Sequence, residues 1–223
     1  GENMKNNMKP SAIEENRQFS EMLKSAIEKL HKYTPEDITR RTNIEFDKEK
    51  SEFHFTSLGK EIHITYPDFD LTPELDMWYH LTILQYIDTS YGTPLGNNLI
   101  SLSEFKDGGV IRGTSFDRKC EFIIRQHIGN KPEEQVKKGC ELLGGKIIKS
   151  KADLSAEFSI LPNFPITVNI WFADDELDGS GKILLNSSAE HYLSVEAAGG
   201  ISTLVLQELI NTFSNKNVSL NIY

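Results

Sequence analysis

The stretch LPNFPITVNIWFADDELDGSGKILLNSSAEHYLSVEA, residues Leu161–Ala197, contains two strand patterns, the acidic segment that joins them and the start of a helix. Ile166–Ala173 and Lys182–Ser187 are short apolar runs bounded by turn-forming residues, which is typical of strands. The polar, glycine-containing segment between them indicates a hairpin loop. Ser194 precedes an apolar run of helical period and predicts a helix N-cap. The block therefore predicts an antiparallel strand pair followed by a helix.

The strand pattern continues upstream of this block. Lys146–Ser150 and Leu154–Leu161 are two further strand candidates, and the second alternates apolar with polar residues. With the pair described above they predict a four-stranded meander.

A separate alternating pattern near the N-terminus predicts a hairpin with its turn at Leu58-Gly59. This register places Phe53 and Phe55 on one apolar face. It sets His54 directly opposite His63 on the other face, which we expect to be exposed.

Helical periodicity and capping residues predict six helices. The helix opened by Thr72-Pro73-Glu74 has apolar residues around most of its circumference, so we expect Trp78 and Leu81 to be nearly inaccessible. The predicted helices span about residues 11–31, 34–40, 72–90, 115–127, 132–143 and 194–213.

These elements predict an α+β fold, with an antiparallel sheet (the meander plus the N-terminal hairpin) packed against helices. The length of 223 residues suits one domain, which we place at residues 11–223. Residues 1–10 are polar and predict a disordered tail.

The composition narrows the classes of partner and compartment. The formal net charge is −9 and no basic stripe interrupts it, which argues against nucleic acid. No window approaches the roughly 20 apolar residues of a membrane span, and the N-terminus lacks a signal-peptide apolar region. The chain has two cysteines, Cys120 and Cys140, too few for a disulfide framework. We expect an acidic, soluble, cytoplasmic protein that binds neither nucleic acid nor membrane.

The densest acidic cluster lies between the two strands of the opening block. From Asp174 it reads D-x-E-x-D-G, which resembles the start of a calcium loop, where alternate oxygen ligands converge. The twelfth position is Leu185 instead of the glutamate that such a loop uses. The alternative is a solvated hairpin tip. The candidate binding residues are Asp174, Asp175, Glu176 and Asp178.

Trp171 is a further candidate binding residue, because it falls on the same face of its strand as Thr167 and Asn169. An aromatic side chain on a nominally polar face suits a pocket or a partner surface. If helices cover both faces of the sheet, Trp171 is instead part of the core.

His54 and His63 are the candidate metal ligands, because two imidazoles at cross-strand distance can hold zinc or nickel. The alternative is the solvated side of a sheet, and we assign no metal. The sequence identifies no cofactor.

Four ordered blocks resemble a family of unknown function: LISLSEFKDGG (99–109), LLGGKIIKSKAD (142–153), ILPNFPITVNIWFADDEL (160–177) and ILLNSSAEHYLSVE (183–196). The resemblance covers roughly residues 75–213. The family occurs mainly in anaerobic bacteria and archaea, and some members are joined to a cysteine-rich, iron–sulfur segment of the kind found in corrinoid one-carbon proteins. This chain has no such segment, and Asp178 stands where the family pattern has proline. The recurring family residues map onto Pro162, Pro165, Trp171, Asp175, Glu176, Ser188, Tyr192 and Leu193.

Residues and resemblance together favour a non-catalytic binding or accessory module, and the resemblance implies a link to anaerobic one-carbon or corrinoid metabolism. Its partner would be a protein or a small molecule. The alternative is a metal-dependent or carboxylate-using enzyme centred on the acidic loop 174–178. Sequence alone leaves open whether the chain is an enzyme.

Overall fold

The computed structural model describes residues 12–222, so the expected disordered tail at residues 1–10 lies outside the described part. The N-terminal half holds α1 (Ala12–Leu30), α2 (Pro35–Thr42), β1 (Glu45–Asp47), β2 (Glu52–Ser57), β3 (Lys60–Thr65), β4 (Leu71–Thr72) and α3 (Met77–Thr89). Its strands form an antiparallel sheet in the order β1-β2-β3-β4.

The C-terminal half carries the second sheet, in the order β5-β9-β8-β7-β6, all antiparallel. The four strands β6 to β9 follow one another along the chain, so the predicted meander is confirmed. The elements are β5 (Leu99–Ile100), η2 (Leu102–Glu104), the π-helix η3 (Gly109–Gly113), α4 (Thr114–His127), α5 (Glu133–Leu142), β6 (Lys146–Ile148), β7 (Leu154–Leu161), β8 (Phe164–Trp171), β9 (Ser180–Asn186), η4 (Ala189–His191) and α6 (Val195–Phe213).

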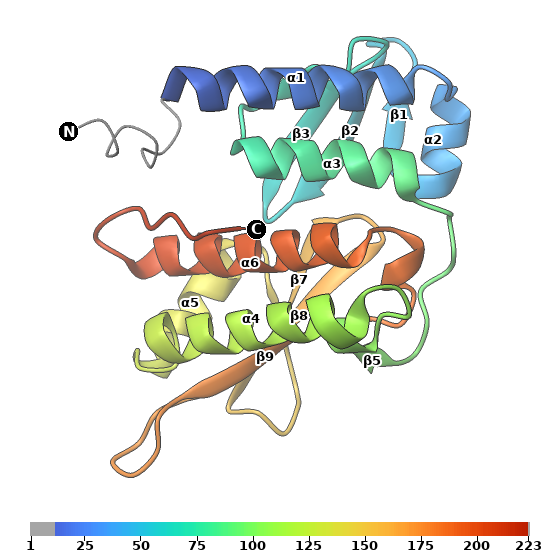
Figure 1. The fold of residues 1–223 in the computed structure, drawn as a ribbon. Helices are drawn as coiled ribbons and strands as arrows, with labels where there is room; N and C mark the ends of the chain where they lie inside the picture. Colours follow the sequence, from blue (N-terminus) through green and yellow to red (C-terminus); the bar gives the residue numbers. More distant parts are fainter. Residues whose placement is uncertain (1–11, 223) are drawn as a thin grey trace, which may run out of the picture.

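Helices and sheets form two layers. Figure 1 shows α1, α3, α6 and α4 nearly parallel, one below the other, with most strands behind them. Each helix in this row packs on the next, α1 on α3, α3 on α6 and α6 on α4. The predicted α+β class is therefore confirmed.

The N-terminal hairpin has the predicted register. Phe53 pairs with Ile64 and His54 with His63. Phe53 is fully buried, while the side chains of His54 and His63 are about one third exposed, at 33% and 37%. The alternation of apolar and polar residues was sufficient here because a one-residue slip would have turned every apolar side chain to solvent.

The start of α3 differs from the prediction. Leu71 and Thr72 pair with β3, and the helix begins only at Met77, where the side chain of Asp76 accepts a hydrogen bond from the Trp78 amide (2.9 Å). Thr72-Pro73-Glu74 has the residue types of a helix start, but the pairing with β3 takes Thr72 into the sheet.

This later start changes the burial of one expected core residue. Leu81 is buried, at 4% exposure, as predicted. Trp78 lies in the first turn of α3 and is only partly buried, so its expected inaccessibility is wrong.

The two halves share contacts across the sheets as well as between α3 and α6. The amide of Leu58, in the turn after β2, donates to the carbonyl oxygen of Ser159 in β7 (2.9 Å). The hydroxyl of Ser57 donates to the carbonyl oxygen of Ile160 (2.5 Å). Buried apolar residues of both halves form one cluster.

Candidate functional site

The acidic loop is a tight turn organised by its first carboxylate. Asp174 accepts hydrogen bonds from the amides of Leu177 (2.7 Å) and Glu176 (2.9 Å). These two donors hold the pKa of the Asp174 carboxyl below its usual range, since they favour the charged form. The Asp174 carboxylate thus forms its hydrogen bonds within its own loop.

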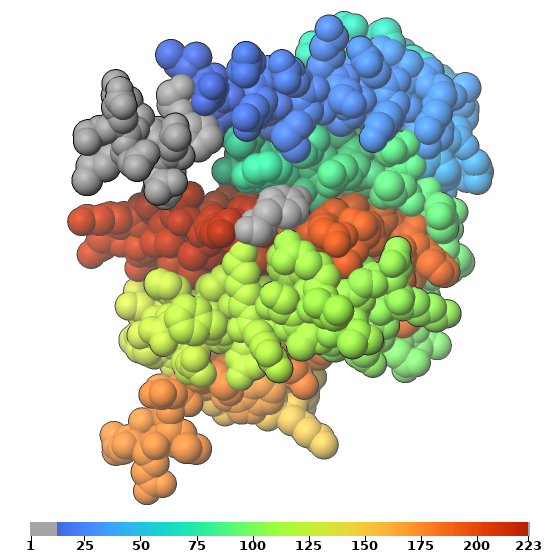
Figure 2. All heavy atoms as spheres, viewed as in Figure 1, coloured from blue at the N-terminus to red at the C-terminus, as the bar shows by residue number. Residues whose placement is uncertain are grey.

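The loop projects from the molecule. Figure 2 shows the end of the β8–β9 hairpin as an orange knob that stands away from the body. Asp175, Glu176 and Asp178 are exposed, and so is Leu177 at 70%. Residues 174–178 line none of five surface cavities found within residues 12–222.

Trp171 lies on the sheet face that α4 does not cover. Gly181 opposes Ile170 in the register, and a Cβ atom at Gly181 would lie 2.6 Å from Cγ2 of Ile124 in α4. Ile170 therefore faces α4, and Trp171, the next residue, faces the other way. It is partly buried at the strand end beside the acidic loop, and it lines none of the five cavities.

His54 and His63 face each other with ring centroids 6.3 Å apart. Each has a glutamate partner: His63 Nδ1 lies 3.0 Å from Glu52 Oε1, and His54 Nε2 lies 3.5 Å from Glu45 Oε2. Within residues 12–222, no three His, Cys, Asp or Glu side chains are placed to hold one metal ion.

Both cysteines are buried free thiols. Burial raises the pKa of the Cys120 thiol and of the Cys140 thiol to about 12. Each therefore stays protonated near neutral pH and lacks the thiolate that nucleophilic or redox chemistry needs.

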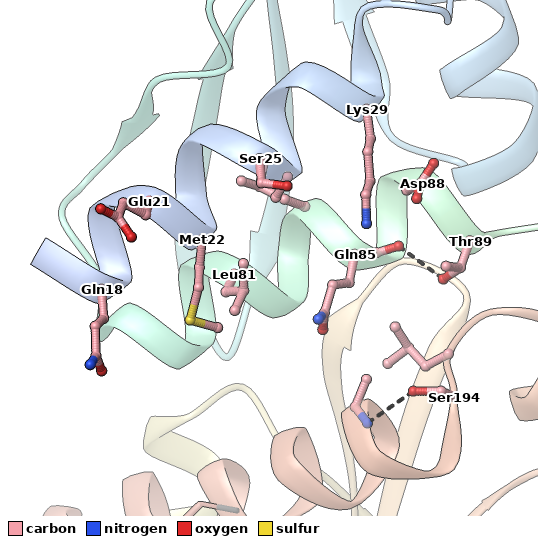
Figure 3. A pocket seen from close by; sticks show the side chains of 14 residues that line it. Gln18, Glu21, Met22, Ser25, Lys29, Leu81, Gln85, Asp88, Thr89 and Ser194 are labelled. Carbon is pink, nitrogen blue, oxygen red and sulfur yellow. Dashed lines mark hydrogen bonds between the residues drawn. The ribbon is translucent and has the colours of Figure 1, made fainter. Parts of the chain in front are cut away.

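A groove of about 710 Å³ lies between α1, α3 and the start of α6. Figure 3 shows it from close by, with α1 above, α3 in the middle and α6 below. A cavity at the C-terminal ends of α4 and α6 is smaller, at about 490 Å³. The groove is lined by Gln18, Glu21, Met22, Ser25, Ala26, Lys29, Leu81, Leu84, Gln85, Asp88, Thr89, Leu193, Ser194 and Ala197.

Helical spacing explains why these residues share a surface. The α1 residues recur at intervals of three and four, so they form one stripe along the helix, and the α3 residues do the same. Ser194 is the N-cap of α6, and its hydroxyl accepts from the amide of Ala197 (3.2 Å). This cap was predicted, and it positions the α6 wall of the groove, which no sequence pattern indicated.

The groove has an apolar floor with polar groups along its edges. Leu81 and Leu84 lie in the floor, while Met22 is 42% exposed on the α1 side. The buried Gln85 Oε1 has no hydrogen-bond partner within the described residues. Figure 3 shows Gln85 and Met22 pointing into the space between α3 and α6.

Charged side chains stand at both ends of the groove. Lys29 and Asp88 lie at one end and Glu21 lies near the other. Asp88 is partly neutralised, because it accepts from the Tyr33 hydroxyl (2.8 Å) and its Oδ1 lies 3.6 Å from Lys32 Nζ.

Comparison with known proteins identifies one family model, described as "Domain of unknown function (DUF3786)", which matches residues 34–208. No curated protein and no solved structure matches the chain. The matched segment includes the α3 wall and the start of α6, whereas α1 precedes it. No helix within residues 12–222 has the length and apolar character needed to cross a membrane.

Proposed function

Because the chain belongs to the DUF3786 family, whose function is unknown, we propose its role from its own surface: a non-catalytic binding or accessory module that holds its ligand between α1, α3 and α6. The observation that carries this proposal is the groove. Its volume of about 710 Å³ falls within the range of roughly 300–1,000 Å³ usual for ligand sites.

The chemistry of the groove supports the same proposal. Ligand sites are mostly apolar and hold a few polar groups that orient the ligand. Here the apolar floor of Leu81 and Leu84 adjoins Gln85, whose buried Oε1 needs a donor. An unsatisfied buried acceptor costs about 1–3 kcal/mol. A ligand in the groove would remove that cost once the Gln85 side chain turns its Oε1 towards the ligand's donor.

The alternative of an enzyme centred on the acidic loop receives less support. A carboxylate site would need a hollow into which Asp175 and Glu176 converge, whereas their segment forms a projection that lines none of the five cavities. The links to anaerobic one-carbon or corrinoid metabolism and to an iron–sulfur partner rest on the resemblance alone and stay predictions. Cytoplasmic location and the lack of nucleic-acid binding also stay predictions.

A pair of matched variants on α1 tests the groove. Ser25 lines it, and Ser20 is an exposed serine of the same helix outside the lining. Ser20 lies five positions before Ser25, which places it about 140° away around α1. Ser25→Trp should fill the groove, while Ser20→Trp should leave it open.

The probe is the uncharged fluorescent dye Nile red, titrated into the folded protein. We expect saturable binding to the parent and to Ser20→Trp, and at least tenfold weaker binding to Ser25→Trp. A parent that binds no dye, or two variants that bind it equally, would contradict the groove as the binding site.

A further inference from the structure

The groove continues into a second cavity along α1. This cavity has about 290 Å³ and is lined by Glu15, Gln18, Phe19, Met22, Met77 and Trp78. Gln18 and Met22 line both cavities, so the two are adjacent along the helix. The partly exposed Trp78 thus belongs to a longer surface.

The joined surface has the length of a short helix. It runs along α1 from Glu15 to Lys29, which at a rise of 1.5 Å per residue is about 21 Å, the length of a helix of about 14 residues. The α1 wall runs along the whole surface, whereas α6 lines it only at the Lys29 end, with Ser194 and Ala197 at its start (Figure 3). A long helical wall beside an apolar floor suits a helix laid along it, as in the helix-in-groove mode of peptide recognition.

The α1–α3 pair shows that this floor accepts a helix. α1 packs on α3, and it contributes Leu23, Ala26 and Ile27 to the core. Next to α1, the groove reaches down to Leu81 and Leu84, whose side chains are only 4% and 1% exposed, and Met22 on α1 adds an apolar side chain that is 42% exposed. Met22 adds an unbranched, adaptable side chain, which helical partners often contact.

The charged residues of the joined surface indicate which kind of partner helix would bind there. Among the described residues that line the joined surface, Glu15, Glu21 and Asp88 are carboxylates and Lys29 is a cation, and Asp88 already has Lys32 Nζ 3.6 Å away. Lysine and arginine side chains supply both a positive charge and donors.

We propose that the joined surface is a docking site for a cationic amphipathic helix of a partner protein. This inference rests on the proposed function and names the partner class for the same groove. The apolar face of the partner helix would lie on Met22 and Trp78, above Leu81, and its basic residues would face Glu15 and Glu21.

The test uses a synthetic 14-residue peptide of leucine and lysine, arranged at helical period and labelled with fluorescein. Its binding to the whole chain is followed by fluorescence anisotropy. The comparison peptides are the same design with glutamate in place of lysine, and the leucine–lysine composition in an order without helical period. In a Trp171→Phe background Trp78 is the remaining tryptophan, so a blue shift of its emission reports contact at that end of the surface.

Two charge-reversal variants with equal change in net charge separate specific docking from general attraction. Glu15→Lys with Glu21→Lys alters the groove edge, and Asp175→Lys with Glu176→Lys alters the projecting acidic loop. We expect the first variant to bind the leucine–lysine peptide at least tenfold more weakly and the second to stay within about twofold of the parent. Circular dichroism and thermal melts establish that both variants are folded.

The outcomes separate this inference from the proposed function. Equal binding of the lysine and glutamate peptides, equal losses in the two charge-reversal variants, or dye binding without peptide binding would overturn the cationic helix and leave the groove as a ligand site. If neither dye nor peptide binds the parent, both proposals fail.

Discussion

At the scale of single residues, the acidic loop divides its carboxylates into one that organises the turn and others that face solvent. Asp174 accepts two amide hydrogen bonds, whereas Asp175 and Glu176 have no side-chain hydrogen bond or ion pair within the described residues. The neighbouring carboxylates therefore differ in role: Asp174 stabilises the turn, and Asp175 and Glu176 do not.

That difference predicts the effect of neutralising the loop. Asp175→Asn combined with Glu176→Gln should leave the melting temperature unchanged or slightly raised, because it removes only repulsion among exposed charges. Asp174→Ala should lower it, because two amides lose their acceptor. Thermal melts with and without a chelator check this. A chelator-sensitive melt of the parent that disappears in the double variant would show instead that the loop binds a cation.

His80 predicts how stability depends on pH. Burial lowers the pKa of its imidazole, and the charge of Asp70 opposes this only in part. The unfolded chain takes up the proton near the ordinary pKa of about 6.5, while the folded chain resists it. The free energy of unfolding should therefore fall as the pH drops through about 6.5 towards the lower folded-state value.

Urea denaturation at pH 7.5 and pH 5.5 measures this dependence. His80→Gln should reduce the loss of stability between the two values, and His191→Gln, at an exposed histidine, should not. Equal pH dependence in the parent and His80→Gln would show that His80 does not carry the effect.

At the scale of elements, the π-helix η3 depends on close backbone contact with η2. A Cβ atom at Gly113 would overlap the carbonyl oxygen of Leu102, and one at Gly109 would lie 2.6 Å from that of Ser103. The carboxylate of Asp117 also accepts from the amides of Leu102 (3.1 Å) and Ser103 (3.0 Å). Glycine is thus required where two backbones meet.

Gly113→Ala should accordingly destabilise the protein by about 1–3 kcal/mol, the usual cost of overpacking a rigid contact. Gly96→Ala is the matched control, because the atom it would meet is the hydroxyl of Ser187, a side chain that can rotate away. That change should stay within about 0.5 kcal/mol. Chemical denaturation of both variants measures the difference, and equal values would show that η3 shifts freely.

At the scale of the whole molecule, a largely buried network of hydrogen bonds joins the two halves. The Tyr86 hydroxyl in α3 donates to the carbonyl oxygen of Thr42 (2.7 Å) and accepts from the amide of Asn163 (3.0 Å), between β7 and β8. Asn163 Nδ2 donates in turn to the Tyr192 hydroxyl (3.2 Å). The apolar core is continuous across the same boundary.

This continuity predicts one cooperative unfolding transition, as expected of the single domain placed at residues 11–223. Calorimetric and van't Hoff enthalpies should agree. Tyr86→Phe should lower the whole transition by about 1–3 kcal/mol, since it leaves buried polar groups unpaired, without splitting it. Two separate transitions would contradict the single domain.

The sequence predictions are right where the structure depends on residues close together in the chain, and wrong where it depends on contacts between distant residues. The hairpin register and the Ser194 cap rest on neighbouring residues, and both are confirmed. The start of α3 was wrong because Thr72 pairs with His63 of β3, a contact that no local pattern reveals. Trp78 was misplaced for the same reason.

The groove, in contrast, depends on how separate elements pack together. Helical period, caps and alternation are set by backbone geometry within one element, so the chain specified its α+β class, the meander and the hairpin without reference to packing. Met22, Leu81 and Ser194 lie on three separate elements. They line one surface only because α1, α3 and α6 pack in one particular order, and that order depends on side-chain fit across the whole core.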